Sequence, residues 1–328
     1  MPEKQTDLSN SNNYSNNNFE TAVIIRNPDN DNADKQAQHA KLRLKHLVRE
    51  IVIEESQSAA ESYKKLLDKY DEPEQNTVWV TVGGDGTFSN FANAKPKSPI
   101  IINPAGTAND IGHMLSGLYT YGHPERILKR GRVADLRPLE IIAQPPDGSE
   151  PFIELAFGYW GAGLSGHVAE KLASDNHRSR RDKKPSTISK LLFDGSAIID
   201  SLQTIPSLKL TENDNEQIRY EFQYVNGSRF ARVFRVGRGQ LLEPKAHRVE
   251  LDNNKTLGLM AAMSKAKLIG VNSQLAEGES HEFKIESEGD FWTQRDGENR
   301  QQLSGTIFSI GFSDYSAKVL TSHRNNLL

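Results

Sequence analysis

Short apolar runs alternate with segments of helical hydrophobic spacing over the first third of the chain. Apolar runs at residues 21–25, 51–53, 77–82 and 99–102 are each bounded by polar or turn residues, and they predict strands. Helices are predicted by spacing at Leu44, Leu47, Val48 and Ile51, at residues 59–70, around Phe88 and Phe91, and at residues 110–115 and 124–129. Such alternation is typical of a doubly wound parallel sheet with helices on both faces.

The pattern changes after residue 133, where short runs separated by turn residues predict a series of strands. They lie at residues 133–142, 152–157, 208–210, 220–225, 230–236, 249–251, 256–260, 281–285 and 306–312. Only residues 166–173 and 188–202 have helical spacing in this part. We therefore predict an α/β plus β fold, in which a doubly wound parallel-sheet domain precedes a mainly antiparallel β domain.

These changes of pattern also predict the domain boundaries. Residues 1–18 are polar and rich in asparagine and serine, and they predict a disordered tail. Residues 19–135 form the predicted parallel-sheet domain, and residues 136–313 form the predicted β-rich domain. Residues 314–328 are a candidate to pack back on the first domain.

Two glycine-rich stretches follow two of the predicted strands. The first is Gly83-Gly84-Asp85-Gly86-Thr87, and the second is Asn-Pro-Ala-Gly-Thr-Ala-Asn-Asp at residues 103–110. A glycine turn at the carboxyl end of a strand lets a phosphate approach backbone N–H groups, and threonine hydroxyls add donors. Asp85 and Asp110 suit Mg²⁺, a ribose hydroxyl or a positioned water. Either stretch alone could be a tight turn, but the two together favour a phosphate site.

These stretches carry a family resemblance. Gly-Gly-Asp-Gly-Thr is shared by the diacylglycerol kinase, sphingosine kinase and NAD kinase superfamily. The second stretch has Pro-x-Gly-Thr-x-Asn-Asp at residues 104–110, which is similar to the lipid-kinase branch, whereas NAD kinases carry a different asparagine-glycine pattern there. The chain therefore resembles a bacterial diacylglycerol-kinase-type lipid kinase, specifically over residues 80–115 and weakly over residues 174–242.

The resemblance implies a kinase that transfers the γ-phosphoryl group of ATP to a lipid hydroxyl, with ATP and Mg²⁺ as cofactors. Residues 19–135 would bind the nucleotide, and residues 136–313 would bind the lipid. The residues implied for nucleotide binding are Asn27, Gly83, Gly84, Asp85, Gly86, Thr87, Thr107 and Asn109. Those implied for a metal are Asp110, Asp135 and Asp252, and those implied for catalysis are Asp85 and Glu298.

Two of these assignments have a simpler interpretation. Asp135 interrupts an apolar strand, so it is either a solvent-facing position or a member of a network with Asp85 and Asp110. The sequence Asp296-Gly297 before Glu298 is a strong hairpin signal, but lipid kinases carry Asp-Gly-Glu in a similar place. The resemblance makes Glu298 the base that takes the proton of the lipid hydroxyl, a role that suits a positioned carboxylate.

Composition narrows the possible partners. The formal net charge is −3, so no global basic field favours nucleic acid, and without cysteine no disulfide or thiol site can form. No apolar run approaches the roughly 20 residues that span a bilayer, and residues 1–18 lack the apolar stretch of a signal peptide. We expect a cytoplasmic protein that reaches a lipid substrate from the inner membrane surface. The sequence leaves open whether the protein forms a homodimer.

Other motifs are weaker or absent. Residues 161–166 match G-x-G-x-x-G, but the charged loop at residues 178–185 follows where a second strand should lie, so a role in lining the cleft between the domains is favoured. That basic loop is either solvated or in contact with anionic lipid headgroups. There is no histidine pair with zinc spacing, no G-x-S-x-G and no Walker A loop.

Three departures from the family pattern leave alternatives open. Asn27-Pro28 is followed by Asp-Asn-Asp-Asn instead of a glycine-lysine loop, residues 235–244 lack the usual glycine triplet before Ala-Pro, and Asp252-Asn253-Asn254 replaces Asp-Asp-Gly. A phosphotransferase for a soluble hydroxyl acceptor and a catalytically silent lipid- or nucleotide-binding protein are therefore the alternatives to a lipid kinase.

Overall fold

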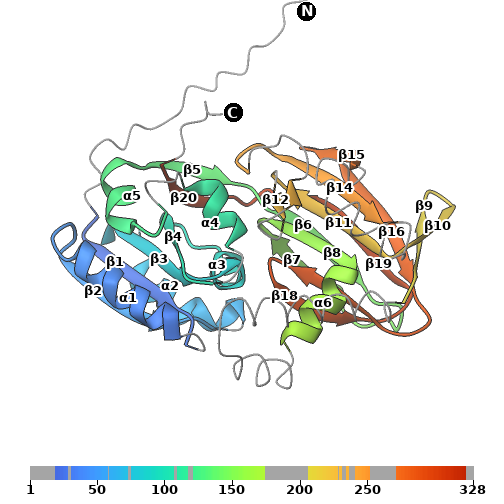
Figure 1. Cartoon of the computed structure of the whole chain (residues 1–328), viewed down its shortest axis with the longest axis horizontal. Coiled ribbons are helices and arrows are strands. Elements are labelled where there is room, and N and C mark those ends of the chain that lie inside the picture. Colours follow the sequence, from blue (N-terminus) through green and yellow to red (C-terminus); the bar gives the residue numbers. More distant parts are fainter. Residues whose placement is uncertain are drawn as a thin grey trace, which may run out of the picture.

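The computed structural model describes residues 19–28, 31–57, 59–72, 75–106, 109–116, 121–173, 206–227, 229–230, 234–235, 241–251 and 271–322. They form two domains side by side (Figure 1). The predicted fold class is confirmed: a mainly parallel sheet with helices on both faces is joined to antiparallel sheets.

The first domain is built on one six-stranded sheet with the order β2-β1-β3-β4-β20-β5. Its strands are β1 (Thr21–Arg26), β2 (Glu50–Glu55), β3 (Thr77–Gly83), β4 (Ile100–Pro104), β5 (Arg132–Leu136) and β20 (Ala317–Thr321). All neighbours are parallel except β20 and β5. The C-terminal strand β20 thus lies between β4 and β5, and this return of the chain is visible in Figure 1.

Helices cover both faces of this sheet. They are α1 (Asp31–Leu44), the 3₁₀ helix η1 (Ala60–Tyr63), α2 (Lys64–Tyr70), α3 (Asp85–Asn93), α4 (Asp110–Leu115) and α5 (Pro124–Arg130). One apolar cluster packs α3, α4 and η1 on one face around Trp79, and another packs α1 and α5 on the other around Val80. Every residue of β3 is buried, as expected for a central parallel strand.

The second domain is a sandwich of two antiparallel sheets. One has the order β10-β9-β16-β19-β6-β7, and the other has the order β15-β14-β11-β8-β17-β18. The strands are β6 (Leu139–Gln144), β7 (Phe152–Ala156), β8 (Tyr159–Gly163), β9 (Leu208–Glu212), β10 (Asn215–Arg219), β11 (Glu221–Asn226), β14 (Lys245–Leu251), β15 (Val271–Ala276), β16 (Ser280–Glu286), β17 (Phe291–Arg295), β18 (Glu298–Gln302) and β19 (Thr306–Phe312). Trp160, Phe283 and Phe308 fill the core between the sheets.

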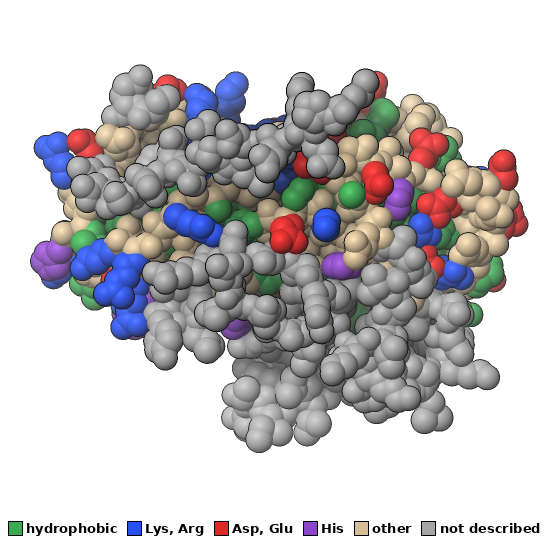
Figure 2. Space-filling model, turned by 90° about the horizontal axis from the view of Figure 1, so that it is seen from above, with side chains coloured by type: hydrophobic (Ala, Val, Ile, Leu, Met, Phe, Trp, Pro, Cys, Tyr) green, Lys and Arg blue, Asp and Glu red, His purple; other side chains and the backbone are tan. Residues whose placement is uncertain are grey.

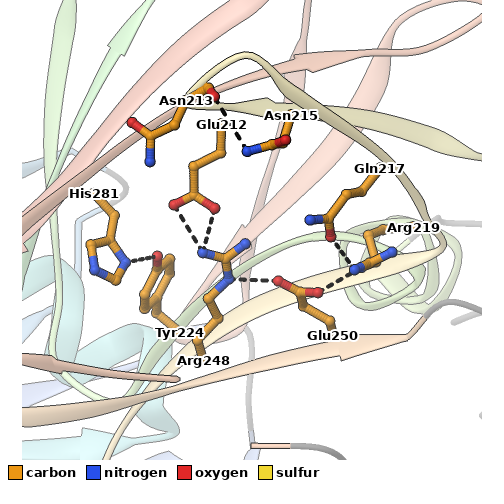
Figure 3. Close-up of polar contacts among 9 residues, drawn as sticks. All are labelled: Glu212, Asn213, Asn215, Gln217, Arg219, Tyr224, Arg248, Glu250 and His281. Atoms are coloured by element: carbon orange, nitrogen blue, oxygen red, sulfur yellow. Dashed lines mark hydrogen bonds and ion pairs between the residues drawn. The ribbon is translucent and has the colours of Figure 1, made fainter. Parts of the chain in front are cut away.

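Two smaller elements complete this domain. Helix α6 (Leu164–Ala173) follows β8 and packs on β17, and β12 (Arg229–Phe230) pairs with β13 (Phe234–Arg235). A charged network closes the end of the sandwich far from the first domain (Figures 1 and 3). Arg248 pairs with Glu212 at 2.7 Å and with Glu250 at 2.6 Å, and Glu250 also pairs with Arg219. Its buried charges are paired, so it is a structural cluster.

Several predicted elements differ from the structure. The helix predicted at Leu44–Ile51 is wrong, because α1 ends at Leu44 and Ile51 lies in β2. The single strand predicted at residues 133–142 is two strands, since Pro138 has no N–H to continue the ladder and the chain passes from one domain to the other there. The predicted strand 256–260 and helix 188–202 lie outside the described residues.

Candidate functional site

The two glycine stretches lie against each other at the carboxyl ends of β3 and β4. The N–H groups of Ala105 and Gly106 both donate to the Gly83 carbonyl, at 2.7 and 3.0 Å. A Cβ on Gly106 would lie 2.5 Å from the Gly84 Cα and 2.8 Å from its nitrogen. Real Cβ contacts are longer than this, so the close approach of the two backbones requires glycine at 106.

Helix α3 starts inside the first stretch. Gly84 is its N-cap in an extended conformation, and no side chain caps the helix. The first N–H groups of a helix have no partner within it, so the start of α3 offers donors and a positive dipole end to an anion. Asn27, at the end of β1, lies beside this region, because its N–H donates to the Val82 carbonyl at 3.1 Å.

Asp85, the first residue of α3, holds the second stretch in place. Its carboxylate accepts the N–H groups of Asp110 at 2.7 Å and Ile111 at 3.0 Å, which are the first two residues of α4. Burial, and then the negative charge of Asp110, raise the pKa of Asp85 from 3.8 to about 7, although the two N–H donors oppose this shift. The predicted pair of acids is therefore real: both are buried, at 6% and 1% exposed.

The second stretch is closed by Asn109 in a left-handed conformation (φ 56°). Its side-chain oxygen accepts the Gly106 N–H at 3.1 Å, and its amide donates to the Gly106 carbonyl at 2.5 Å. Asparagine tolerates this conformation better than most residues because its short polar side chain bonds locally. Asn109 thus shapes the loop that touches Gly84.

The hairpin between β17 and β18 comes from the other domain and meets α3. Asp296 and Gly297 form its two-residue turn, both with positive φ (48° and 90°), as a type I′ hairpin requires. Asp296 is fully buried, and its carboxylate accepts the N–H groups of Phe157, Gly158 and Tyr159 at 2.7 to 2.9 Å. It also accepts the Ser89 hydroxyl on α3 at 2.8 Å, so one carboxylate ties both domains together.

Glu298 follows this turn, and it lies against the glycine stretch although more than two hundred residues separate them in sequence. A Cβ on Gly86 would collide with its Oε1 atom and would lie 3.2 Å from its Cδ. The side chain is exposed, in contrast to Asp296 two residues earlier. The structure therefore brings Glu298 to the start of α3, next to the residues with which the resemblance groups it.

Other predicted site residues stand apart from this cluster. Asp135 is exposed on the edge strand β5, where Ser316 donates to it at 3.4 Å, so of the two alternatives it takes the solvent-facing position. An alternating edge strand presents every second side chain to solvent, and the sequence alone could not tell which face that was. Thr107 and Asp252 lie outside the described residues.

The acidic side chains of the described residues do not form a complete metal site by themselves. Within the described parts of the chain, no group of three or more histidine, cysteine, aspartate or glutamate residues could hold a metal ion. Mg²⁺ that accompanies a nucleotide needs only one or two carboxylates, because phosphates and water supply its other ligands. The buried Asp85 and Asp110, whose charges disfavour one another, fit such an ion.

Three site residues were missed from the sequence. Asp296 had been noted only as a turn residue, and Ser89 not at all. Tyr159 is a third: it is buried beside Asp85, Asp296 and Asp110, and burial, followed by these negative charges, raises its pKa well above the usual value. The acid of an Asp-Gly turn can cap backbone groups of another segment, but no local pattern identifies that segment.

This architecture sets a glycine-lined turn, at the switch between strand and helix, against an acid contributed by a second β domain. Residues 21–141, which span the first domain, match the family model described as "Diacylglycerol kinase catalytic domain". No curated protein sequence matched the chain.

Solved structures share this two-domain fold at low sequence identity. A diacylglycerol kinase from Bacillus anthracis str. Sterne has a TM-score of 0.61 at 14% identity, covering 92% of this chain and 97% of that one. A putative diacylglycerol kinase from the same strain has a TM-score of 0.60 at 14% identity, covering 94% and 98%. Yeast NADH kinase complexed with NADH has a TM-score of 0.51 at 10% identity, covering 94% and 85%. At these identities the likeness concerns the fold alone.

Proposed function

We propose that the protein is an ATP-dependent lipid kinase, which transfers the γ-phosphoryl group of ATP to a hydroxyl of a diacylglycerol-like or other membrane lipid. The observation that carries the proposal is the contact between the start of α3 and the Glu298 carboxylate. A site for the phosphates of the nucleotide and a base for the acceptor then lie next to each other across the two domains.

The nucleotide phosphates would bind at the glycine stretches. The residues proposed to surround them are Asn27, Gly83, Gly84, Gly86, Thr87, Thr107 and Asn109. The backbone N–H groups at the start of α3 are fixed by the helix before the ligand arrives, so little reorganisation opposes binding. Mg²⁺ would be held near Asp85 and Asp110, and it would neutralise phosphate charge and orient the γ-phosphoryl group.

Glu298 would act as the base. The oxygen of the lipid hydroxyl forms a bond to the γ-phosphorus, the bond to the ADP oxygen breaks, and the hydroxyl proton passes to the Glu298 carboxylate. An alcohol is a poor nucleophile, and a carboxylate within reach accepts its proton as the phosphoryl group arrives. Asp296 would support this step by fixing the turn that positions Glu298.

The lipid would have to be reached from a membrane surface. Among the helices of the described residues, none has the length and apolar content needed to cross a membrane. On the face shown in Figure 2, lysine and arginine side chains are prominent over the first domain. Such side chains attract anionic headgroups, in keeping with a cytoplasmic protein that works peripherally at the inner membrane surface.

Phosphoryl transfer to defined acceptors tests the proposal. The full chain is incubated with γ-labelled ATP, Mg²⁺ and mixed micelles that contain diacylglycerol, a glycosylated diacylglycerol or no acceptor lipid, and with soluble hydroxyl compounds in parallel. Label in a lipid product that Glu298→Gln reduces at least a hundredfold supports a lipid kinase. Label only in a soluble product would assign a soluble acceptor. ATP binding with no transfer to any acceptor would assign the silent binding protein.

A further inference from the structure

A polar pocket of about 140 Å³ lies beside Glu298 of the second domain. It lies between α3 and the β17–β18 hairpin, and its wall includes Asn90, Glu154, Arg295, Glu298 and Arg300. Arg295 and Glu298 face each other across the hairpin as paired residues that flank the turn. The proposed base is therefore part of the pocket wall, and an acceptor held in the pocket would place a hydroxyl at Glu298.

The wall offers hydrogen-bond donors in fixed positions. Arg295 is half-buried and anchored, because its Nη2 donates to Asn90 on α3 at 2.8 Å, while none of the residues that the structure describes accepts a hydrogen bond from its buried Nε. The guanidinium of Arg300 lies over the ring of Phe152, 4.2 Å from the centroid, which holds its plane in place. Both groups keep further N–H donors for an occupant, since a guanidinium carries five.

The same wall offers acceptors. Glu154 is buried (7% exposed), and no hydrogen bond or ion pair within the described residues engages its carboxylate. Glu298 supplies a second carboxylate. Two cations and two carboxylates leave the pocket without a net charge, so it is not built for a simple anion or cation.

Mixed donors and acceptors around a small polar space match hydroxyl groups. Each hydroxyl donates one hydrogen bond and accepts up to two, so a group with several hydroxyls needs both kinds of partner. A diacylglycerol has one hydroxyl beside ester oxygens that only accept. It would leave the carboxylate of Glu154 unsatisfied, which disfavours its binding.

We infer that this pocket binds a hydroxyl-rich head of the acceptor, such as a sugar or polyol, and presents one of its hydroxyls to Glu298. This inference rests on the proposed function and names the acceptor class for the same site. The shared chemistry is the polyol, which a glycolipid or a free sugar could supply.

The test compares three acceptors that differ only in the relevant part. Two are lipids in mixed micelles, dioleoylglycerol and the same lipid carrying one glucose. The third is free glucose in solution. Wild-type protein should phosphorylate the glucosyl lipid with a kcat/KM at least tenfold above that of dioleoylglycerol. A preference for dioleoylglycerol would overturn the inference. Transfer to free glucose alone would keep the polyol class but identify a soluble source.

Variants connect this preference to the pocket. Arg300→Met removes donors from an exposed, stacked side chain, so the fold should be retained. It should raise the KM for the glucosyl lipid about tenfold with a smaller change in kcat, and it should leave the KM values for ATP and dioleoylglycerol unchanged. Lys284→Met, which removes a cation from a half-exposed position on β16, is the matched control and should change none of these. An equal change for both lipids would overturn the inference.

Binding is measured separately from turnover. Micelles with and without the glucosyl lipid are titrated into the protein in the presence of a non-hydrolysable ATP analogue. Arg300-dependent binding of the glucosyl lipid without any transfer would overturn the proposed kinase function but keep the pocket assignment. Equal binding by wild type and Arg300→Met would overturn the pocket assignment whatever the turnover shows.

Discussion

The glycine turn of the first domain and the Asp296–Gly297 turn of the second meet at one place and are built by opposite means. The glycine turn has almost no side chains, and its shape comes from backbone contact between Gly84 and Gly106. The hairpin turn depends on side chains: Asp296 fixes it by four hydrogen bonds, and Glu298 projects from it. The first type of site is contained in a local motif, whereas the second exists only when distant segments are assembled.

The strongest test of this comparison removes the anchor of the hairpin. Asp296→Ala leaves three buried backbone N–H groups and the Ser89 hydroxyl without an acceptor, so we expect a loss of about 3–5 kcal/mol in the free energy of unfolding. Chemical denaturation measures it. Asp296→Asn keeps one acceptor oxygen and tolerates positive φ, so it should lose less. A loss below 1 kcal/mol for the alanine variant would show that the turn does not depend on this side chain.

The second test separates the two carboxylates of the hairpin. Glu298→Gln should reduce phosphoryl transfer about 10²-fold or more, because the proton acceptor is lost, while the unfolding free energy changes little at this exposed position. Single-turnover transfer and denaturation are compared for the same variant, and ATP affinity should survive. A destabilisation as large as that of Asp296→Ala would mean that Glu298 also has a structural role.

The third test compares two glycines of the first domain, of which Gly106 meets Gly84 and Gly86 meets Glu298 of the hairpin. Gly106→Ala places a Cβ 2.5 Å from the Gly84 Cα, so the two stretches must separate and ATP affinity should fall about tenfold, or 1.4 kcal/mol. Gly86→Ala meets only the end of the flexible Glu298 side chain, so it should lower kcat about tenfold with a smaller loss of ATP affinity. Titration calorimetry and steady-state kinetics distinguish them. The reverse ranking for ATP affinity would contradict this division of roles.

The last test concerns pH and compares a carboxylate from each domain. Asp85 accepts N–H groups at the start of α4, and Glu221 accepts the Ser165 N–H at 2.8 Å near the start of α6. Burial raises the pKa of Asp85 from 3.8 to about 7 and that of Glu221 from 4.5 to about 8. The folded state therefore binds more protons than the unfolded state between the lower and upper values, and stability should fall as pH rises through this window.

Each group can contribute at most about 1.4 kcal/mol per pH unit to this decline. Asp85→Asn should remove the part of the decline in stability that falls between about pH 4 and 7. Glu221→Gln should remove the part that continues to about pH 8. Denaturation midpoints measured from pH 5 to 8 give both slopes. An unchanged slope in Glu221→Gln would show that the Glu221 carboxyl does not hold a proton in this range.

The sequence determined the first domain well because its evidence is local. The apolar runs of β1, β3 and β4 are continuous since both faces of a parallel sheet are covered, and the glycine stretches follow directly after two of them. The spacing argument failed at residues 44–51, where apolar residues in a loop and a strand happened to continue the helical period. The resemblance then added Glu298, which no periodicity would have selected.

Only the tertiary structure decided the rest. Strand β18, Glu-Asn-Arg-Gln-Gln, has no apolar residue, so the Asp-Gly turn before it predicted a hairpin but not the partner that the hairpin meets. Strand β20 joins the first sheet from the far end of the chain, and its place between β4 and β5 has no local signal. The roles of acids were settled by what surrounds them: Asp135 is exposed, while Asp296 is buried under donors from another hairpin and another domain. A residue type and its neighbours in sequence specify what a side chain can bind, but the free energy of that binding depends on burial and on partners that folding brings from elsewhere.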